Sequence, residues 1–406
     1  MEREIIPVTK PYLLQEELQS IKEVLDSGWL VQGKKVSEFE KAVADHEQVL
    51  YCCATTSCTT ALQLAMLAEG MKEGMDVLVP SFTFVATANA VVSTGAVPVI
   101  LDVDPETFNL SPDAVQACIQ KQYHKKQGKW LNKTTGNQLW GMVPVHQFGL
   151  CADMERINGI AQKYELHVIE DAACALGAGI GERHIGGFGH TACVSFHPRK
   201  SITTGEGGMI LTNDPEIYEK VTALRNHGSM VNSDARQKGN GTLLPDYPFH
   251  GYNFRMTDIQ GAIGCQQIRK LDYILQKRRE LAARYDWLFS GDGEKLKIPS
   301  VPGGYYHTYQ SYVCRLKLGE DLAEAAGKRN RFMEKLQECG IQTRQGTHAI
   351  HKLAYYQKRF GIPDADLPGA SRCDAETVAF PLFVTMTREE QNYVTEQVKR
   401  FLINLQ

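Results

Sequence analysis

The chain has 406 residues, of which 43% are hydrophobic and 22% are charged, and its formal net charge is -3. This length predicts one large domain and a smaller one, and the near-neutral charge argues against general binding to nucleic acid or anionic lipid. The most apolar region, residues 77–103, is interrupted by Pro80, Asn89 and Gly95 and predicts no membrane span. Residues 1–19 lack the pattern of a secretory signal. Eleven cysteines without CxxC spacing favour a reducing cytoplasm and predict neither a disulfide framework nor a metal site.

Short apolar runs alternate with helical patterns through the first two thirds of the chain. Strands that alternate with helices predict an α/β fold with a mostly parallel central sheet covered by helices on both faces. Continuous apolarity in several of the runs is typical of strands buried on both sides. In chain order, the predicted strands are 48–54, 76–80, 97–103, 142–148, 166–171, 193–196 and 208–214, and the predicted helices are 60–71, 86–95, 111–120 and 153–165.

The pattern changes in the last third of the chain. Residues 258–289 predict one long helix, and short strands mixed with amphipathic helices follow it. We therefore expect a large domain over residues 1–265 and a smaller C-terminal α+β domain over residues 266–406. Residues 125–138 are polar and basic, which predicts a solvated surface insertion.

Hydroxyl side chains follow the first predicted strand. Thr56, Ser57 and Thr59 precede a helix expected to begin near Thr60. A helix N-terminus offers free backbone N–H groups and the positive end of the helix dipole, which suits a phosphate group. Serine and threonine are also ordinary N-caps, so this feature alone leaves both interpretations open.

Two further strand ends carry ionisable side chains. A buried strand ends in Glu170 and Asp171, and a desolvated carboxylate there needs a cationic partner, such as a protonated heterocycle nitrogen, or a helix to cap. Another strand delivers Ser195, and a turn at Pro198 then brings Lys200 before a glycine-rich loop. A phosphate site, a carboxylate and an amine match the phosphate, the ring nitrogen and the aldehyde of pyridoxal 5'-phosphate, whose aldehyde forms a Schiff base with lysine.

Seven motifs in order extend this interpretation: GWLVQGKKVSEFEKAVA, PSFTFVATANAV, GAVPVILDVDPETFNL, VPVHQFG, VIEDAACALGA, SFHPRKSITTGEGG and GYNFRMTDIQGAIGCQQ. Over nearly the whole chain the sequence resembles the DegT/DnrJ/EryC1/StrS family of sugar aminotransferases, which have the fold of the aspartate aminotransferase superfamily. The resemblance implies pyridoxal phosphate fold type I in the large domain. Several long motifs in the right order are far more specific than any one short pattern.

The resemblance assigns roles to particular residues. It implies that Lys200 forms the Schiff base, that Asp171 pairs with the ring nitrogen and that Phe84 stacks on the ring. It also implies that Ser195 binds the phosphate.

Further roles concern the phosphate-binding turn and the neighbouring subunit. The turn at Ser57 and Cys58, with Thr59 after it, matches the family's phosphate-binding turn. Asn253 matches a residue that reaches the phosphate from the neighbouring subunit, which implies a homodimer with shared active sites.

Two positions depart from the family pattern. Cys58 stands where many relatives have glycine, which matters little if the contact is made by backbone, and Cys174 stands where many have glutamine or histidine beside the ring. The second departure puts a side-chain hydrogen bond to the cofactor in doubt. Candidate substrate contacts are His197, for which local packing or a solvated charge is the alternative, and Arg255, Arg344, His348 and Tyr355.

The implied reaction moves an amino group from L-glutamate to a keto-deoxysugar carried by a nucleoside diphosphate. A cyclitol aminotransferase acting on an inosose-type ketone fits the same residues. A sugar dehydratase of this fold would carry histidine in place of Lys200, and a non-catalytic binding relative would be expected to lack Lys200 or Asp171, so both are disfavoured. The sequence leaves open the sugar, the carbon that is aminated and the pathway.

Overall fold

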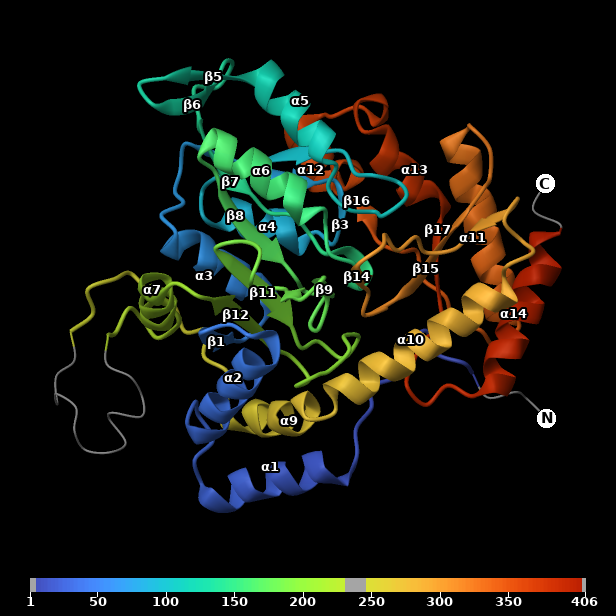
Figure 1. Cartoon of the computed structure of the whole chain (residues 1–406), viewed down its shortest axis with the longest axis horizontal. Helices are drawn as coiled ribbons and strands as arrows, with labels where there is room; N and C mark the ends of the chain where they lie inside the picture. The colour runs from blue at the N-terminus through green and yellow to red at the C-terminus, as the bar shows by residue number, and fades with distance from the viewer. Residues whose placement is uncertain (1–4, 231–245, 404–406) are drawn as a thin grey trace.

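The central feature of the protein is a sheet enclosed by helices (Figure 1). The computed structural model describes residues 5–230 and 246–403. The strand order is β1-β12-β11-β8-β7-β2-β4, in which β12 runs antiparallel to both neighbours and the remaining pairs are parallel, as the sequence predicts. The strands are β1 (Tyr51–Thr55), β2 (Met75–Pro80), β4 (Val97–Leu101), β7 (Gln138–Met142), β8 (His167–Asp171), β11 (Thr191–Ser195) and β12 (Gly208–Thr212).

Helices bury both faces of this sheet because successive strand residues point to opposite sides. Cys193 and Ile210 pack on one face, and their neighbours Ala192 and Met209 pack on the other. The first face is covered by α3 (Cys58–Ala68), α4 (Ala86–Ser93) and α7 (Pro215–Arg225). The second face is covered by α2 (Lys34–Glu47), α5 (Pro112–Gln122), α6 (Met154–Tyr164) and α9 (Asp258–Ile268).

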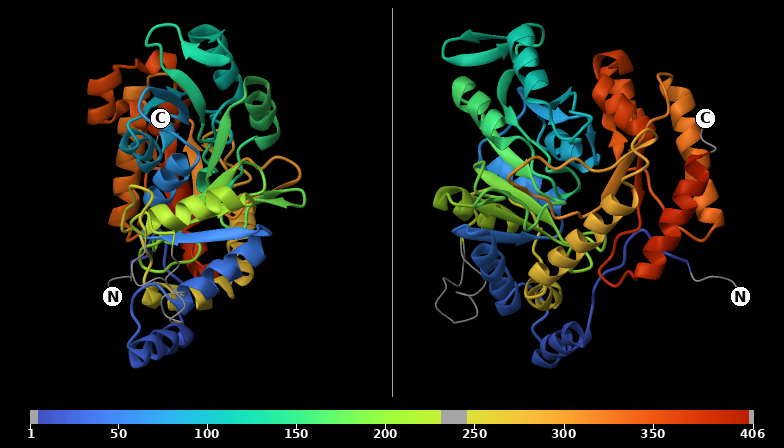
Figure 2. Two further views of the ribbon diagram at one scale, coloured as in Figure 1. Left: turned by 90° about the vertical axis from the view of Figure 1, so that its left-hand side faces the viewer. Right: turned by 45° about the vertical axis from the view of Figure 1, so that its right-hand side comes forward.

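The C-terminal part has a core of its own, built on a three-stranded antiparallel sheet. The right-hand view of Figure 2 shows this part in orange and red beside the large sheet, with the gold α10 leading into it. Its elements are α10 (Leu271–Leu288), β13 (Leu296–Lys297), β15 (Tyr312–Leu316), α11 (Leu322–Glu338), α12 (Ala354–Phe360), α13 (Pro368–Glu376), β17 (Thr377–Phe380) and α14 (Arg388–Leu402). Ile6 also packs in this core and pairs with Ile341, so the N-terminal segment crosses to it. The expected division between residues 265 and 266 falls inside α9 and stays a prediction.

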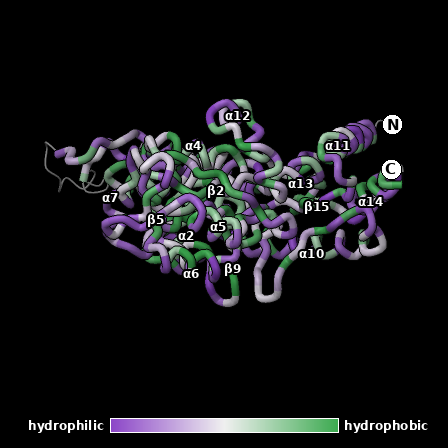
Figure 3. The backbone as a smooth tube through the Cα atoms, turned by 90° about the horizontal axis from the view of Figure 1, so that it is seen from above, coloured by the Kyte–Doolittle hydropathy of each residue, from purple (hydrophilic) through white to green (hydrophobic). Residues whose placement is uncertain are grey.

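Short strand pairs join distant segments around the large sheet. β3 (Phe82–Thr83) pairs with β16 (His348–Ala349), which the 3-10 turn Ile350–Lys352 follows. β9 (Gly179–Ile180) pairs with β10 (Arg183–His184) and with β14 (Tyr305–Tyr306). Figure 3 shows the most apolar backbone running through the middle of the molecule, at β2 for example. Among the helices of the described ranges, none is long and apolar enough to cross a membrane.

Three sequence expectations need correction. The predicted strand 142–148 is wrong in position, because β7 ends at Met142 and Pro144 has no N–H for a ladder. The predicted single helix 258–289 is two helices, α9 and α10. The predicted insertion 125–138 is surface-exposed over much of its length, but most of it forms a hairpin of β5 (Tyr123–Lys126) and β6 (Lys129–Asn132) that joins β7.

Candidate active site

The phosphate-binding residues predicted from the sequence meet at one end of three adjacent strands. In the register of the sheet, Gly208 lies between Thr55 of β1 and Ser195 of β11. A Cβ atom on Gly208 would lie 2.4 Å from the backbone nitrogen of Cys58, so only glycine allows the start of α3 to approach this closely. Ser57 therefore lies on the same edge of the sheet as Ser195.

The start of α3 keeps backbone donors available for an anion. Ser57 caps the helix, because its Oγ accepts the N–H of Thr60 at 3.2 Å. The N–H groups of Cys58 and Thr59 belong to the first turn, which has no intrahelical acceptors for them. Cys58 Sγ is turned inward toward the carbonyl of Cys193 (3.5 Å), which leaves its backbone as the group at the turn. The capping and phosphate interpretations of Ser57 are therefore compatible.

The adjacent carboxylates Glu170 and Asp171 are held on different networks. Glu170 accepts the backbone N–H groups of Gly186, Phe188 and Gly189, and its Oε2 lies 2.8 Å from Nε2 of His146. These contacts give Glu170 a structural role. Asp171 remains as the carboxylate that the carboxyl end of β8 presents to the site.

Asp171 is buried and partly satisfied. Its Oδ2 accepts a hydrogen bond from Thr87 Oγ1 at 2.7 Å, and its Oδ1 accepts the N–H of Ala173 at 3.2 Å. Burial raises the pKa of Asp171 above its ordinary value, while the bond from Thr87 opposes this. A cation placed against this carboxylate would stabilise its charged form.

Lys200 lies next to Cys174. Its Nζ donates a hydrogen bond to Cys174 Sγ at 3.0 Å. Burial lowers the pKa of the Lys200 amine, but Cys174 and the negative field of Asp171 raise it by more, so the net pKa lies above its ordinary value. The cysteine that departs from the family pattern therefore contacts the lysine itself.

The turn before Lys200 is fixed by its own hydrogen bonds. The N–H of Lys200 donates to the carbonyl of His197 at 2.8 Å, and the N–H of Arg199 donates to His197 Nδ1 at 3.2 Å. Burial lowers the pKa of His197, and the nearby Lys200 lowers it as well. His197 thus supports the turn, and its predicted substrate contact stays a prediction.

An exposed aromatic ring stands beside a strand from the C-terminal part. Phe84 follows β3, and 65% of its surface is exposed, unlike the fully buried Phe82 two residues earlier. Antiparallel pairing places His348 of β16 opposite Thr83, which precedes Phe84 in the chain. The structure therefore brings the exposed His348 close to the predicted stacking residue.

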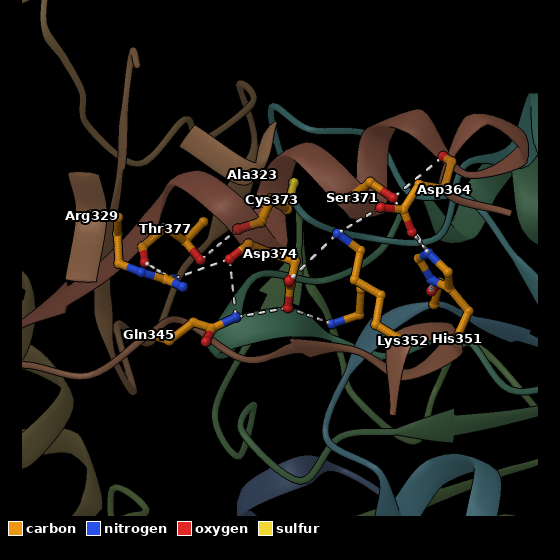
Figure 4. A network of polar contacts seen from close by, with 12 residues as sticks. Ala323, Arg329, Gln345, His351, Lys352, Asp364, Ser371, Cys373, Asp374 and Thr377 are labelled. Carbon is orange, nitrogen blue, oxygen red and sulfur yellow. Dashed lines mark hydrogen bonds and ion pairs between the residues drawn. The ribbon is translucent and has the colours of Figure 1, made fainter. Parts of the chain in front are cut away.

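A polar network holds the loop that carries His348 (Figure 4). Asp374 on α13 accepts hydrogen bonds from Gln345 Nε2 at 2.7 Å and from the N–H of Ala349 at 3.0 Å. Lys352 links Asp374 Oδ2 (3.7 Å) to Asp364 Oδ2 (3.1 Å). These contacts connect the loop to α13.

The remaining predicted cofactor and substrate residues lie on other segments of the chain. Asn253 is exposed on a segment that runs beside β1, where the carbonyl of Phe254 accepts the N–H of Thr56. Arg255 donates to Asn226 Oδ1 at 2.9 Å. Arg344 is exposed, and its backbone pairs with Ala379. Tyr355 lies on α12, where its hydroxyl accepts a hydrogen bond from Arg359.

Two contributors escape the sequence analysis. Thr87 lies in the first turn of α4 and reaches Asp171 across 84 positions of sequence. His146 contacts Glu170, and its backbone N–H donates to the carbonyl of Asp171 at 3.0 Å. The only local signal for Thr87 is its place three residues after Phe84.

The donor set fits pyridoxal 5'-phosphate. First-turn N–H groups at Cys58 suit its phosphate, the desolvated Asp171 suits a protonated ring nitrogen, and Lys200 offers an amine for its aldehyde. Gly208 keeps the phosphate end open, because a side chain there would meet the backbone of Ser57. This arrangement, at the carboxyl edge of a mostly parallel sheet, defines a fold type I pyridoxal-phosphate enzyme.

The comparisons with known proteins specify the class further. The model of the DegT/DnrJ/EryC1/StrS aminotransferase family matches residues 11–399. The chain belongs to this family of pyridoxal-phosphate-dependent sugar aminotransferases. The predicted family, fold and cofactor are confirmed.

Individual relatives are similar over almost their whole lengths. SpsC of Bacillus subtilis, a spore coat polysaccharide biosynthesis protein, is 34% identical over 395 residues, which cover 97% of this chain and 96% of SpsC. The aminotransferase TlmJ from Streptoalloteichus hindustanus is 30% identical, with a TM-score of 0.84 over 99% of this chain and 100% of TlmJ. DesV of S. venezuelae, solved in complex with a ketimine intermediate, is 26% identical, with a TM-score of 0.84 over 98% of this chain and 99% of DesV.

Proposed function

We propose that this enzyme transfers an amino group from L-glutamate to a keto-deoxysugar carried by a nucleoside diphosphate. The observation that carries the proposal is the contact between the Lys200 amine and Cys174, in a site that also holds the buried Asp171. Lys200 disfavours a sugar dehydratase, which would carry histidine at this position. The similarity to SpsC, a polysaccharide biosynthesis protein, supports a sugar as the acceptor.

The cofactor would be held by groups from several elements. Ser57, Ser195 and the first-turn N–H groups of Cys58 and Thr59 would bind its phosphate, and Phe84 would cover its ring. When bound, pyridoxal phosphate supplies an electron sink for the carbon that loses a proton.

Two side chains manage protons in the proposed reaction. Asp171 keeps a proton on the ring nitrogen, because its buried carboxylate is stabilised by a cationic partner. Lys200 Nζ is the base that moves the proton of the amino donor, and it lies on a turn fixed by His197. Cys174 orients that amine through the 3.0 Å contact.

The acceptor would enter beside Phe84. His348 and Arg344 are exposed on the segment that the network around Asp374 holds in place, so they are the proposed sugar contacts. His197, Arg255 and Tyr355 remain further candidate substrate contacts. Loops and domain junctions are where such specificity is usually placed.

A homodimer is part of the proposal. Leu18 and Leu25 are exposed on α1 (Gln15–Ser27), and Trp29, Leu30 and Val31 are exposed directly after it. Contiguous apolar exposure of this kind marks a protein interface, and a second copy is its proposed occupant. All eleven cysteines are free, and we assign the enzyme to the reducing cytoplasm.

The first experiment is an absorption spectrum of the purified holoenzyme before and after L-glutamate is added. We expect the band of the lysine-bound cofactor to convert to that of the aminated cofactor, and a nucleotide-linked ketosugar to reverse the change. Reversal by an inosose alone would assign the enzyme to cyclitols. Absence of any band after cofactor is supplied would overturn catalysis and favour a binding protein.

Lys200→Ala should lower the rate at which L-glutamate aminates the supplied cofactor by roughly 100- to 10,000-fold, because general-base catalysis contributes about that much. The exposed Lys220 of α7 offers a matched control, and Lys220→Ala should leave the rate unchanged. Both variants are compared in single-turnover experiments with L-glutamate. Substantial turnover in Lys200→Ala would remove the lysine from its assigned role.

A further inference from the structure

Outside the site around Lys200, three side chains with metal-binding atoms converge near the start of α10. They are His46 and Glu47 at the end of α2, and His184 on β10. One ligand atom from each lies within 4.8 Å of the others. The sequence predicts no metal site from its cysteine spacing, and His184 is remote in sequence from the other two residues.

Glu47 is a buried carboxylate with one oxygen unsatisfied. Its side chain is 0% exposed, and its Oε1 accepts the N–H of Gly177 at 2.9 Å. Within residues 5–230 and 246–403, its Oε2 has no hydrogen-bond partner. A buried charge normally finds a partner or a metal ion, because leaving it unpaired is costly.

His184 faces this unsatisfied oxygen. Its Nδ1 is buried, lies 3.7 Å from Glu47 Oε2, and has no hydrogen-bond partner in the described part of the chain. The distance is too long for a hydrogen bond. Two ligand atoms on a tetrahedral ion with bonds of roughly 2.0–2.1 Å lie roughly 3.3 Å apart. The 3.7 Å distance between His184 Nδ1 and Glu47 Oε2 is close to this value.

The outer ring nitrogens of both histidines have polar neighbours. His46 Nε2 lies 3.1 Å from Asp272 Oδ1 on α10, and His184 Nε2 lies 3.5 Å from the side-chain nitrogen of Gln48. Each Nδ1 is thereby directed toward Glu47, with His46 Nδ1 at 2.9 Å from Oε1. A histidine that ligates a metal is usually oriented in this way by a carboxylate or another polar group on its second nitrogen.

We propose that His46, Glu47 and His184 form a binding site for a divalent transition-metal ion of the zinc type. Two imidazole nitrogens and one carboxylate oxygen suit zinc and leave a fourth position for water. An ion there would join the end of α2, the hairpin strand β10 and the loop at Gly177, and through Asp272 it would brace the start of α10. Figure 1 shows α10 as the helix that leads to the C-terminal part.

His46 pairs with both carboxylates when no ion is present. Its Nδ1 lies 2.9 Å from Glu47 Oε1, and its Nε2 lies 3.1 Å from Asp272 Oδ1. These contacts leave Glu47 Oε2 and His184 Nδ1, which are 3.7 Å apart, without a hydrogen bond in the described ranges. An ion ligated by Glu47 and both histidines would bridge that gap.

A second cluster provides an internal control. Glu69, His167 and His190 also converge, but His190 Nδ1 accepts the N–H of Val168 at 3.2 Å. The two Glu69 oxygens are engaged by Thr191 (2.8 Å) and His167 (2.9 Å). These ligand atoms are occupied, so we infer no site there.

The test is zinc binding by the dialysed holoenzyme, measured by equilibrium dialysis with metal analysis and by the shift of the thermal unfolding midpoint. Wild type and His190→Gln should each bind one more zinc ion per chain than His184→Gln, and only those two should be stabilised by zinc. Asp272→Asn, which keeps all three ligands, should weaken binding by about 10-fold or more.

Equal zinc binding by wild type and His184→Gln would overturn the proposal, as would an equal loss in His184→Gln and His190→Gln. If His184→Gln does not fold, Asp272→Asn decides: unchanged zinc affinity in that variant would overturn the site. Transamination by His184→Gln should equal that of wild type, because the cluster lies outside the catalytic machinery.

Discussion

Thr87 determines how Asp171 is held. Its hydroxyl donates the shorter hydrogen bond to that carboxylate, at 2.7 Å, and accepts one from the hydroxyl of Thr83 at 3.1 Å. Thr87→Val preserves the shape of the side chain but removes the donor. A hydrogen bond to a charged group contributes about 1.5–3 kcal/mol, so we expect a slowing of about 10- to 150-fold in the single-turnover reaction with L-glutamate.

Thr83→Val is the matched control for this prediction, because Thr83 reaches Asp171 only through Thr87. Its rate should stay within a few-fold of wild type. The pH at which the cofactor band changes should shift in Thr87→Val and not in Thr83→Val, a signature that loss of packing alone would not give. Equal impairment of the two variants would contradict the positioning role of Thr87.

His307 links stability to pH. Burial lowers its pKa to about 3, and its ring stacks on Tyr309 with centroids 4.0 Å apart. Below an unfolded pKa of about 6.5, the unfolded chain binds a proton that the folded chain rejects. The free energy of unfolding should therefore fall with decreasing pH, by about 1.4 kcal/mol per unit between about pH 6.5 and 3 from this residue.

Urea unfolding at pH 7 and pH 5 measures this effect by comparison with His307→Asn. The variant should be less stable at pH 7 but should lose about 2 kcal/mol less on acidification. Replacement of the exposed His124 by asparagine should reproduce the pH dependence of wild type. Parallel losses in wild type and His307→Asn would show that His307 does not carry the effect.

At the scale of elements, the β5–β6 hairpin is attached to the sheet through Asp76 of β2. This buried carboxylate accepts hydrogen bonds from Tyr123 (2.8 Å), Asn132 (2.9 Å) and Asn137 (2.8 Å). Asp76→Ala removes the shared acceptor and leaves buried donors unpaired. We expect a loss of about 2–4 kcal/mol in the free energy of unfolding, measured with urea.

Lys126→Ala, at the exposed end of the same hairpin, is the control and should change stability by less than about 0.5 kcal/mol. The hairpin joins the sheet at β7, whereas Lys200 follows β11, which lies on the other side of β8. Neither variant should therefore alter the rate with L-glutamate. A loss in Asp76→Ala no larger than in Lys126→Ala would show that the hairpin is not anchored through this carboxylate.

The sequence predicts the parallel sheet well because strands buried on both faces are apolar throughout, as in residues 97–101. It fails where tertiary contacts decide. The break between α9 and α10 contains neither glycine nor proline, but Lys270 at the break pairs with Glu17 at 2.6 Å. An ion pair between residues so far apart in sequence does not change the hydrophobic periodicity from which a helix is predicted.

The site divides in the same way. The sequence indicates Lys200, Ser57 and Asp171 as candidates because the first two come shortly after a strand and Asp171 ends one, where an open α/β sheet presents its functional groups. Thr87 and Asp374 are not, since their partners are distant in sequence and their own neighbourhoods look like ordinary helix. Functional side chains at strand ends can be predicted from the sequence, whereas the residues that orient these side chains are identified only from the three-dimensional structure.

At the scale of the whole molecule, the proposed dimer predicts a specific form of complementation. If Asn253 serves the site of the partner, each site combines Lys200 of one chain with Asn253 of the other. In a dimer of one Lys200→Ala chain and one Asn253→Asp chain, one site then carries both substitutions and the other site carries neither. Each variant alone should be nearly inactive, the second because a negative charge would face the phosphate. Random mixing should restore about one quarter of wild-type activity, because half of the dimers are mixed and each carries one intact site.

Co-expression of the two chains with different affinity tags isolates the mixed dimers, in which about half of wild-type activity is expected. If Asn253 served its own chain instead, each mixed dimer would carry one defect in each site, and mixing would restore nothing. Pairing Lys200→Ala with Asp171→Asn gives the control. Both residues belong to the site of their own chain, so each mixed dimer carries one defect in each site and has no intact site. Restoration in the first pair and not in the second would establish shared sites. Absence of restoration in both would place the phosphate contact of Asn253 within its own subunit and remove the main reason for a functional dimer.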